Sequence, residues 1–163
     1  NKKSRIHGEK FRLSKPMSPN ADAQVDGVII SSKRLKIPET KNNLIIEGAG
    51  GLMVPLNNNE LVIDTISIFN AEVVLVSSIY LGSINHTLLS VEALKKRKIK
   101  VLGIIFNGKQ NQETESVILK YSGLTLLGRI NQEKIINKNM ILRYAKSFRT
   151  TFLSKFETLE VLK

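Results

Sequence analysis

A carboxylate followed by a glycine-dense turn is the feature of this sequence with the clearest chemical meaning. Glu47 stands directly behind an aliphatic run at 44–46 and opens the sequence Glu-Gly-Ala-Gly-Gly at 47–51. A carboxylate at the end of a buried strand must face solvent or a cation, and glycines let a backbone close on a phosphate group. The pattern favours a binding site for a metal-bound nucleotide. The structural alternatives are that Glu47 forms a salt bridge or caps a helix, or that the glycines form another tight turn.

The segment at 78–86 could form a second site, for an anion. It joins a predicted strand to a predicted helix, with Gly82 relieving the turn and Ser83 or Asn85 able to cap the helix. Free amides at the start of that helix would suit a carboxylate or a phosphate. His86 is a candidate catalyst, but a lone histidine is more often a structural hydrogen bonder, and we favour that interpretation.

An asparagine amide at the end of another strand could recognise a base. Asn107 can both donate and accept hydrogen bonds, which suits a purine edge, although Asn107 and Gly108 could equally form a simple turn. The surrounding residues 103–110 nearly match the phosphate-loop pattern, but Gln110 replaces the Ser or Thr that would bind magnesium. Because four of these positions belong to the predicted strand itself, we interpret the match as accidental.

Alternating strands and helices must position these groups. Nearly continuous aliphatic stretches are typical of buried parallel strands, and they occur at 44–46, 73–77, 101–106 and 124–128. Helices are predicted at 21–30 (opened by Ser18 and Pro19), at 84–94, at 113–120 and at 133–146, with a further amphipathic pattern at 152–159. The class is therefore α/β. Ligands of open parallel sheets bind beyond the carboxyl ends of the strands, where Glu47, Ser77, Ser78 and Asn107 are all expected.

Composition narrows the class of protein further. The 163 residues suffice for one domain, there is no cysteine, and no apolar stretch approaches the length that crosses a bilayer. We therefore expect a soluble, cytoplasmic protein without a membrane partner. The net charge of +11 could suggest nucleic-acid binding, but the densest basic run, at 95–98, falls where cations complement the end of a helix, and no stacking motif accompanies it. We expect no nucleic-acid partner.

Taken together, these motifs resemble the dethiobiotin synthetase family. The resemblance rests on the segments at 16–19, 47–51 with 55–56, 81–88, 103–107 and 127–130, in matching order and spacing. It implies a three-layer parallel sheet of the phosphate-loop nucleotide hydrolase type, in a homodimer whose substrate lies near the subunit interface. It also implies a reaction that uses ATP and Mg²⁺: 7,8-diaminononanoate takes up CO₂ as a carbamate, the carbamate is phosphorylated, and the second amine displaces phosphate.

The resemblance also implies roles for particular residues. Glu47 would be a magnesium ligand. Nucleotide-binding residues would be Glu47, Gly48, Ala49, Gly50, Asn107, Gly108, Asn131, Gln132 and Glu133. The substrate carboxylate would be held, from the neighbouring subunit, by Leu81, Gly82, Ser83, Ile84 and Asn85.

Two departures from the family pattern affect these expectations. The phosphate-loop strand, its lysine and a second metal ligand are expected upstream of Asn1, so that residues 1–163 would form a single domain equivalent to the carboxyl-terminal three-quarters of such an enzyme and lack its catalytic residues. We expect this chain alone to be inactive. Asn131 stands where the family usually has proline.

Two alternatives to a dethiobiotin synthetase stay open. One is a non-catalytic dimerisation or partner-binding remnant of the same fold, and the other is a partitioning-type ATPase that binds DNA.

Overall fold

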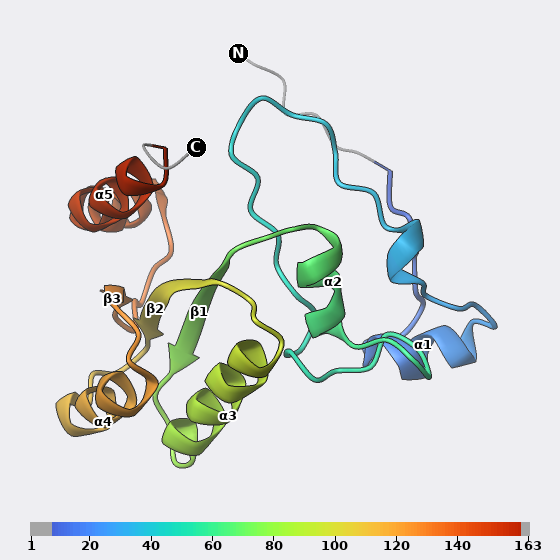
Figure 1. Cartoon of the computed structure of the whole chain (residues 1–163), viewed down its shortest axis with the longest axis horizontal. Coiled ribbons are helices and arrows are strands. Elements are labelled where there is room, and N and C mark those ends of the chain that lie inside the picture. Colours follow the sequence, from blue (N-terminus) through green and yellow to red (C-terminus); the bar gives the residue numbers. More distant parts are fainter. Residues whose placement is uncertain (1–7, 161–163) are drawn as a thin grey trace. The chain divides into compact units, whose positions relative to one another are not determined.

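The computed structural model describes residues 8–160, including the side chains of residues 8–153. The chain divides into two compact units, Asn1–Ala71 and Glu72–Lys163, each of which is described by itself (Figure 1). Among the described residues, none of the helices is both long enough and apolar enough to cross a membrane.

A parallel sheet organises the second unit. Its strands are β1 (Val73–Ser78), β2 (Val101–Asn107) and β3 (Leu126–Ile130), in the order β1-β2-β3. Helices α3 (Ser83–Lys96) and α4 (Gln112–Ser122) connect successive strands and pack against each other, whereas α5 (Lys138–Glu160) packs against β3 (Figure 1). The predicted α/β class is confirmed, as are three of the four predicted strands, although β3 begins at residue 126 rather than 124.

The central strand carries most of the core of this unit. Ile104 and Phe106 of β2 are fully buried with Ile118 of α4, and partly buried side chains such as Leu75 and Ile84 pack against them. Gly103 and Ile104 are both buried although neighbouring residues of a strand face opposite sides of the sheet, which agrees with the continuous aliphatic run at 101–106. Burial of these side chains is the main stabilising contribution to the unit.

Local signals set the ends of the helices. α3 follows Gly82, α4 begins where the Asn111 side chain accepts a hydrogen bond from the Thr114 amide, and α4 ends at Gly123 in the left-handed region. The basic run falls at the end of α3, as expected. The prediction that the last helix starts at 133 is wrong: residues 131–137 form an irregular segment, Ile135 and Ile136 are exposed, and the helix starts at Lys138.

The first unit is smaller and less regular. It contains α1 (Pro19–Val25), a 3₁₀ turn η1 (Ser32–Arg34) and α2 (Val62–Ile68). A core of Ala23, Ile30, Leu56 and Val62 holds these segments together. Ser18 and Pro19 open α1 as predicted, but the helix ends at Val25 rather than at 30 because the chain turns at Gly27, whose φ is +65°.

The predicted strand at 44–46 is wrong. These residues have no regular structure, and the side chain of Ile45 is 94% exposed. A strand is held by hydrogen bonds to a neighbouring strand, and no described residue pairs with 44–46. Helix α2 is not among the predicted helices; its start is marked by the Asp64 carboxylate, which accepts a hydrogen bond from the Leu61 amide at 2.8 Å.

Candidate functional site

Strand register brings three of the segments singled out in the sequence to one edge of the sheet. Ser78 at the end of β1 pairs with Asn107 at the end of β2, and Asn107 pairs with Ile130 at the end of β3. The segments at 78–85, 107–108 and 131–133 therefore follow neighbouring strands at the carboxyl edge. Glu47 belongs to the other unit, so its expected place at this edge stays a prediction.

The turn before α3 offers unpaired backbone donors. Gly82 has a φ of +97°, and the Ser83 amide donates back to the Tyr80 carbonyl at 3.0 Å. The amides of Ile84 and Asn85 lie in the first helical turn and have no acceptor among the described residues. Since these amides stand at the positive end of the helix dipole, the turn can bind a carboxylate or a phosphate.

The side chain of His86 closes this turn. Its Nδ1 lies 2.7 Å from the Tyr80 hydroxyl, and a Cβ at Gly82 would lie 3.6 Å from its Cε1. The contact agrees with our interpretation of His86 as a structural hydrogen bonder. The expected cap by Ser83 or Asn85 is wrong, because the residue in the capping position is Gly82, which has no side chain to donate or accept.

Buried hydroxyl groups lie at the base of the same helix. The Ser77 and Thr87 hydroxyls are 2.8 Å apart, and both side chains are buried. Ser83 is 1% exposed, and its Oγ has no hydrogen-bond partner in the described part of the chain. The Ser77–Thr87 contact fixes α3 to β1 and so holds the turn at a defined place on the sheet edge.

Asn107 and Gly108 form the middle of the edge. The Asn107 side chain is exposed, and Gly108, with a φ of +102°, turns the chain and donates its amide to the Ile130 carbonyl at 2.9 Å. Gly103 lies within β2, where a Cβ would come within 2.5 Å of the Thr125 carbonyl oxygen. This glycine is explained by close strand packing, which supports our interpretation of the phosphate-loop match as accidental.

The segment at 131–133 is tied to α5. The Asn131 amide donates to the Tyr144 hydroxyl at 2.9 Å, and that hydroxyl donates to Glu133 Oε1 at 2.6 Å. Arg143 also donates to this carboxylate, at 2.5 Å. The Tyr144 hydroxyl first, and then Arg143, lower the pKa of Glu133, while Glu133 raises the pKa of Arg143. The carboxylate is therefore ionised and paired at neutral pH.

A nearly buried arginine joins two of the edge segments, and sequence analysis missed its role. Arg129 of β3 forms an ion pair with Glu115 of α4. One of its terminal nitrogens also donates to the Gly108 carbonyl at 2.7 Å and to Asn131 Oδ1 at 3.2 Å. Burial lowers the pKa of Arg129. A charged residue inside an otherwise apolar strand was the signal that could have identified it.

An open hollow of about 630 Å³ lies beside the segment at 131–133. Its walls come from this segment and from the first turns of α5, and they are formed by Gln132, Glu133, Lys134, Ile135, Asn137, Asn139, Met140 and Arg143. Two of the three residues that sequence analysis assigned to the nucleotide in this segment, Gln132 and Glu133, thus line one hollow.

In the first unit, the turn at 47–51 is exposed, and several of its polar groups have no partner among the described residues. Glu47 has no hydrogen bond or ion pair to another described residue, and the amides of Gly48, Ala49 and Gly50 have no acceptor there. Close packing explains part of the glycine pattern, because a Cβ at Gly50 would lie 2.9 Å from Val54 Cγ2. The remaining features, a free carboxylate beside unpaired amides, can bind a cation and phosphate oxygens.

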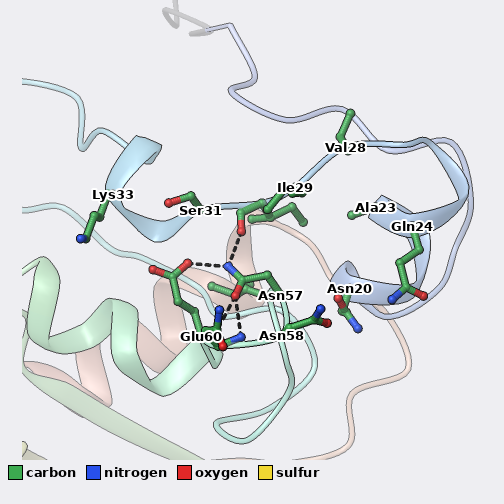
Figure 2. Close-up of a pocket in the computed structure, with 13 residues that line it drawn as sticks. Asn20, Ala23, Gln24, Val28, Ile29, Ser31, Lys33, Asn57, Asn58 and Glu60 are labelled. Atoms are coloured by element: carbon green, nitrogen blue, oxygen red, sulfur yellow. Dashed lines mark hydrogen bonds between the residues drawn. The ribbon is translucent and has the colours of Figure 1, made fainter.

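Another hollow, of about 410 Å³, lies in the first unit, and none of the residues predicted to bind nucleotide, substrate or metal lines it (Figure 2). At its wall, Glu60 accepts hydrogen bonds from the Ser32 hydroxyl at 2.6 Å and from Asn57 at 2.6 Å. The bonds from Ser32 are the main cause of a lowered pKa of Glu60. These contacts join the loop at 57–60 to residues 30–32, and we assign them a structural role.

The described residues could supply one carboxylate ligand to a magnesium ion. Mg²⁺ bound with a nucleotide usually takes one or two protein carboxylates, with phosphate oxygens and waters as its other ligands. No cluster of three His, Asp or Glu residues able to hold a metal ion occurs among the described residues. Glu47, with its unpaired carboxylate, suits the role of one such ligand.

Comparison with known proteins identifies the family. The sequence model of a family described as "AAA domain" matches residues 1–139. The chain is 49% identical over 141 residues to an ATP-dependent dethiobiotin synthetase of Cytophaga hutchinsonii, covering 86% of this chain and 68% of the relative. It is 48% identical over 149 residues to an enzyme of the same name from Christiangramia forsetii, covering 91% and 72%. The chain therefore belongs to the family of ATP-dependent dethiobiotin synthetases.

Proposed function

We propose that this ATP-dependent ligase of biotin biosynthesis forms the cyclic urea of dethiobiotin from 7,8-diaminononanoate and CO₂. One amine of the substrate adds to CO₂ and loses a proton to give a carbamate. The carbamate oxygen accepts the γ-phosphoryl group of ATP, and the second amine then attacks the carbonyl carbon, closes the ring and releases phosphate. Identity to named synthetases over most of the chain is the observation that carries this proposal.

The turn at the start of α3 would bind the substrate carboxylate. Leu81, Gly82, Ser83, Ile84 and Asn85 form it, and the unpaired amides of Ile84 and Asn85 match an anionic group in charge and hydrogen-bonding capacity. We propose that this turn acts on the substrate of the neighbouring subunit in a homodimer. Anchoring the carboxylate end would leave the two amines, at the other end of an apolar chain, to be positioned for reaction.

We propose nucleotide-binding residues in each unit, taken separately. Gly48, Ala49 and Gly50 would contact phosphate oxygens through their unpaired amides. Asn107 and Gly108 would contact adenine, and the segment at 131–133 would complete the adenine site. Glu47 would be a ligand of Mg²⁺, which would neutralise negative charge on the phosphates. The exposed amide of Asn107 offers the donor and acceptor that an adenine edge requires.

Phosphoryl transfer also needs positive charge around the γ-phosphate. The 163 residues contain no phosphate-loop sequence with its lysine. We propose that residues outside this sequence supply the phosphate-loop lysine and that the 163 residues alone do not catalyse the reaction. We also propose that the enzyme acts in the cytoplasm.

Isothermal titration of 7,8-diaminononanoate, with and without Mg-ATP, would test the proposal. The titrations should use both this chain and a version extended upstream through a phosphate loop, with dethiobiotin formation measured in parallel. We expect binding and product formation in the extended version. Absence of binding by either version would contradict the proposal and favour a non-catalytic dimerisation or partner-binding role of the same fold.

A further inference from the structure

Asn131 is hydrogen-bonded through its backbone in a way that proline would not allow. Its amide donates to the Tyr144 hydroxyl at 2.9 Å, and proline has no amide hydrogen to donate. The same hydroxyl donates to Glu133 at 2.6 Å. One hydroxyl group of α5 therefore binds the first and the third residue of the segment at 131–133, which has no regular structure of its own.

The side chain of Asn131 is held from the opposite direction. Its Oδ1 accepts a hydrogen bond from Arg129 at 3.2 Å, and the same nitrogen of Arg129 donates to the Gly108 carbonyl at 2.7 Å. The guanidinium is anchored by Glu115, and the two side chains are only 15% and 10% exposed. A planar guanidinium held by a buried carboxylate has little freedom, so it fixes the distance between Gly108 and Asn131.

We propose that Arg129 and Tyr144 are positioning residues that hold the two base-binding segments, 107–108 and 131–133, in place through Asn131. The inference rests on the proposed function, which places the adenine of ATP at these segments. An irregular segment that is already ordered loses less conformational entropy when a ligand binds. Arg129 and Tyr144 thus set the affinity for the nucleotide and take no part in phosphoryl transfer.

Removing the tyrosine hydroxyl tests this role in the complete protein. Tyr144→Phe keeps the ring but removes the acceptor for the Asn131 amide and the donor to Glu133. We expect the KM for ATP to rise about threefold to tenfold, as for loss of a hydrogen bond, with unchanged kcat and an unchanged KM for 7,8-diaminononanoate. Tyr121→Phe is the matched control, because it removes the hydroxyl of an exposed tyrosine on α4.

A second variant tests whether the Tyr144 hydroxyl acts through its hydrogen bond with the Asn131 amide. Asn131→Pro removes the amide hydrogen and the side-chain acceptor, and we expect it to raise the KM for ATP at least as much as Tyr144→Phe does. Because both changes delete the bond between Asn131 and Tyr144, the double variant should show less than the product of the two single effects. Melting temperatures measured alongside identify any variant that is simply unfolded. If Asn131→Pro does not fold, Asn131→Ala, which keeps the amide hydrogen and removes only the acceptor for Arg129, tests the Arg129 contact instead and should also raise the KM for ATP.

Asn107→Ala separates the failure of this inference from the failure of the proposed function. If Asn107→Ala weakens ATP binding while Tyr144→Phe and Asn131→Pro leave the KM for ATP unchanged, the positioning role is wrong and the nucleotide site stands. If none of the three variants changes ATP binding, the proposed placement of adenine is wrong as well. Equal increases in the KM values for ATP and for 7,8-diaminononanoate in Tyr144→Phe would also overturn the inference, since they would indicate a general structural role.

Discussion

The sheet edge of the second unit and the exposed turn of the first unit each contain residues singled out in the sequence, and they are built differently. At the sheet edge, strand register places Asn107 between Ser78 and Ile130, and hydrogen bonds with Arg129 and Tyr144 hold Asn131. At the turn, the Glu47 carboxylate and the amides of residues 48–50 have no partner among the described residues. The first arrangement is stabilised by pairing within the sheet, whereas the second leaves Glu47 and the amides of residues 48–50 without partners among the described residues.

The largest difference between the two regions should appear in stability. Phe106→Ala removes a fully buried side chain from the central strand, and we expect the free energy of unfolding to fall by about 3–5 kcal/mol. Ile45→Ala is the matched change beside the exposed turn, where we expect less than about 0.5 kcal/mol. Urea denaturation followed by circular dichroism measures both. A large loss in Ile45→Ala would show that residues 44–46 are buried in solution.

For catalysis, we expect a change in the exposed turn of the first unit to have the large effect. Glu47→Gln keeps the shape of the side chain but removes the charge that would bind Mg²⁺, so we expect kcat of the complete enzyme to fall at least about 100-fold. Since Glu47 has no partner to lose among the described residues, the melting temperature should barely change. Glu39→Gln, at another exposed glutamate of the same unit, is the control and should keep full activity. Normal turnover in Glu47→Gln would remove Glu47 from the site.

Substrate binding should depend on the shape of the turn before α3. Gly82 has a φ of +97°, which valine adopts only with strain, so Gly82→Val should distort the turn that presents the Ile84 and Asn85 amides. We expect binding of 7,8-diaminononanoate to weaken about tenfold or more, with a smaller effect on ATP. Titration of each ligand measures both affinities. Equal losses for the two ligands would indicate general misfolding instead.

The same contrast explains which parts could be predicted from sequence. The runs at 73–77 and 101–106 were correctly predicted because each forms a strand that pairs with a neighbour in the sheet, and Gly82 marked the turn before α3. The run at 44–46 has similar composition but no pairing partner among the described residues, and composition alone does not reveal this. The contacts of Arg129 with Glu115, Gly108 and Asn131 depend on how β3 and α4 pack, which no local pattern encodes.

The smallest effect we predict concerns Glu60, whose contacts stabilise the first unit without serving the proposed site. Hydrogen bonds from Ser32 lower the pKa of Glu60 in the folded chain. A carboxyl group with a lowered folded pKa stabilises the fold above its unfolded pKa, about 4.3 for glutamate, and loses that contribution as the pH falls through the folded value.

We therefore expect Glu60→Gln to cost about 1 kcal/mol at pH 7 and progressively less below about pH 4.3. Denaturation of the original chain and the variant at pH 7, 5 and 3 measures the difference. The lowered pKa of Glu133 makes both proteins less stable in acid, but it cancels when the two are compared. A difference independent of pH would show that Glu60 contributes through packing rather than through its charge. Stabilisation by an ionised, paired carboxylate would then be confined to the sheet edge, where Glu133 is paired.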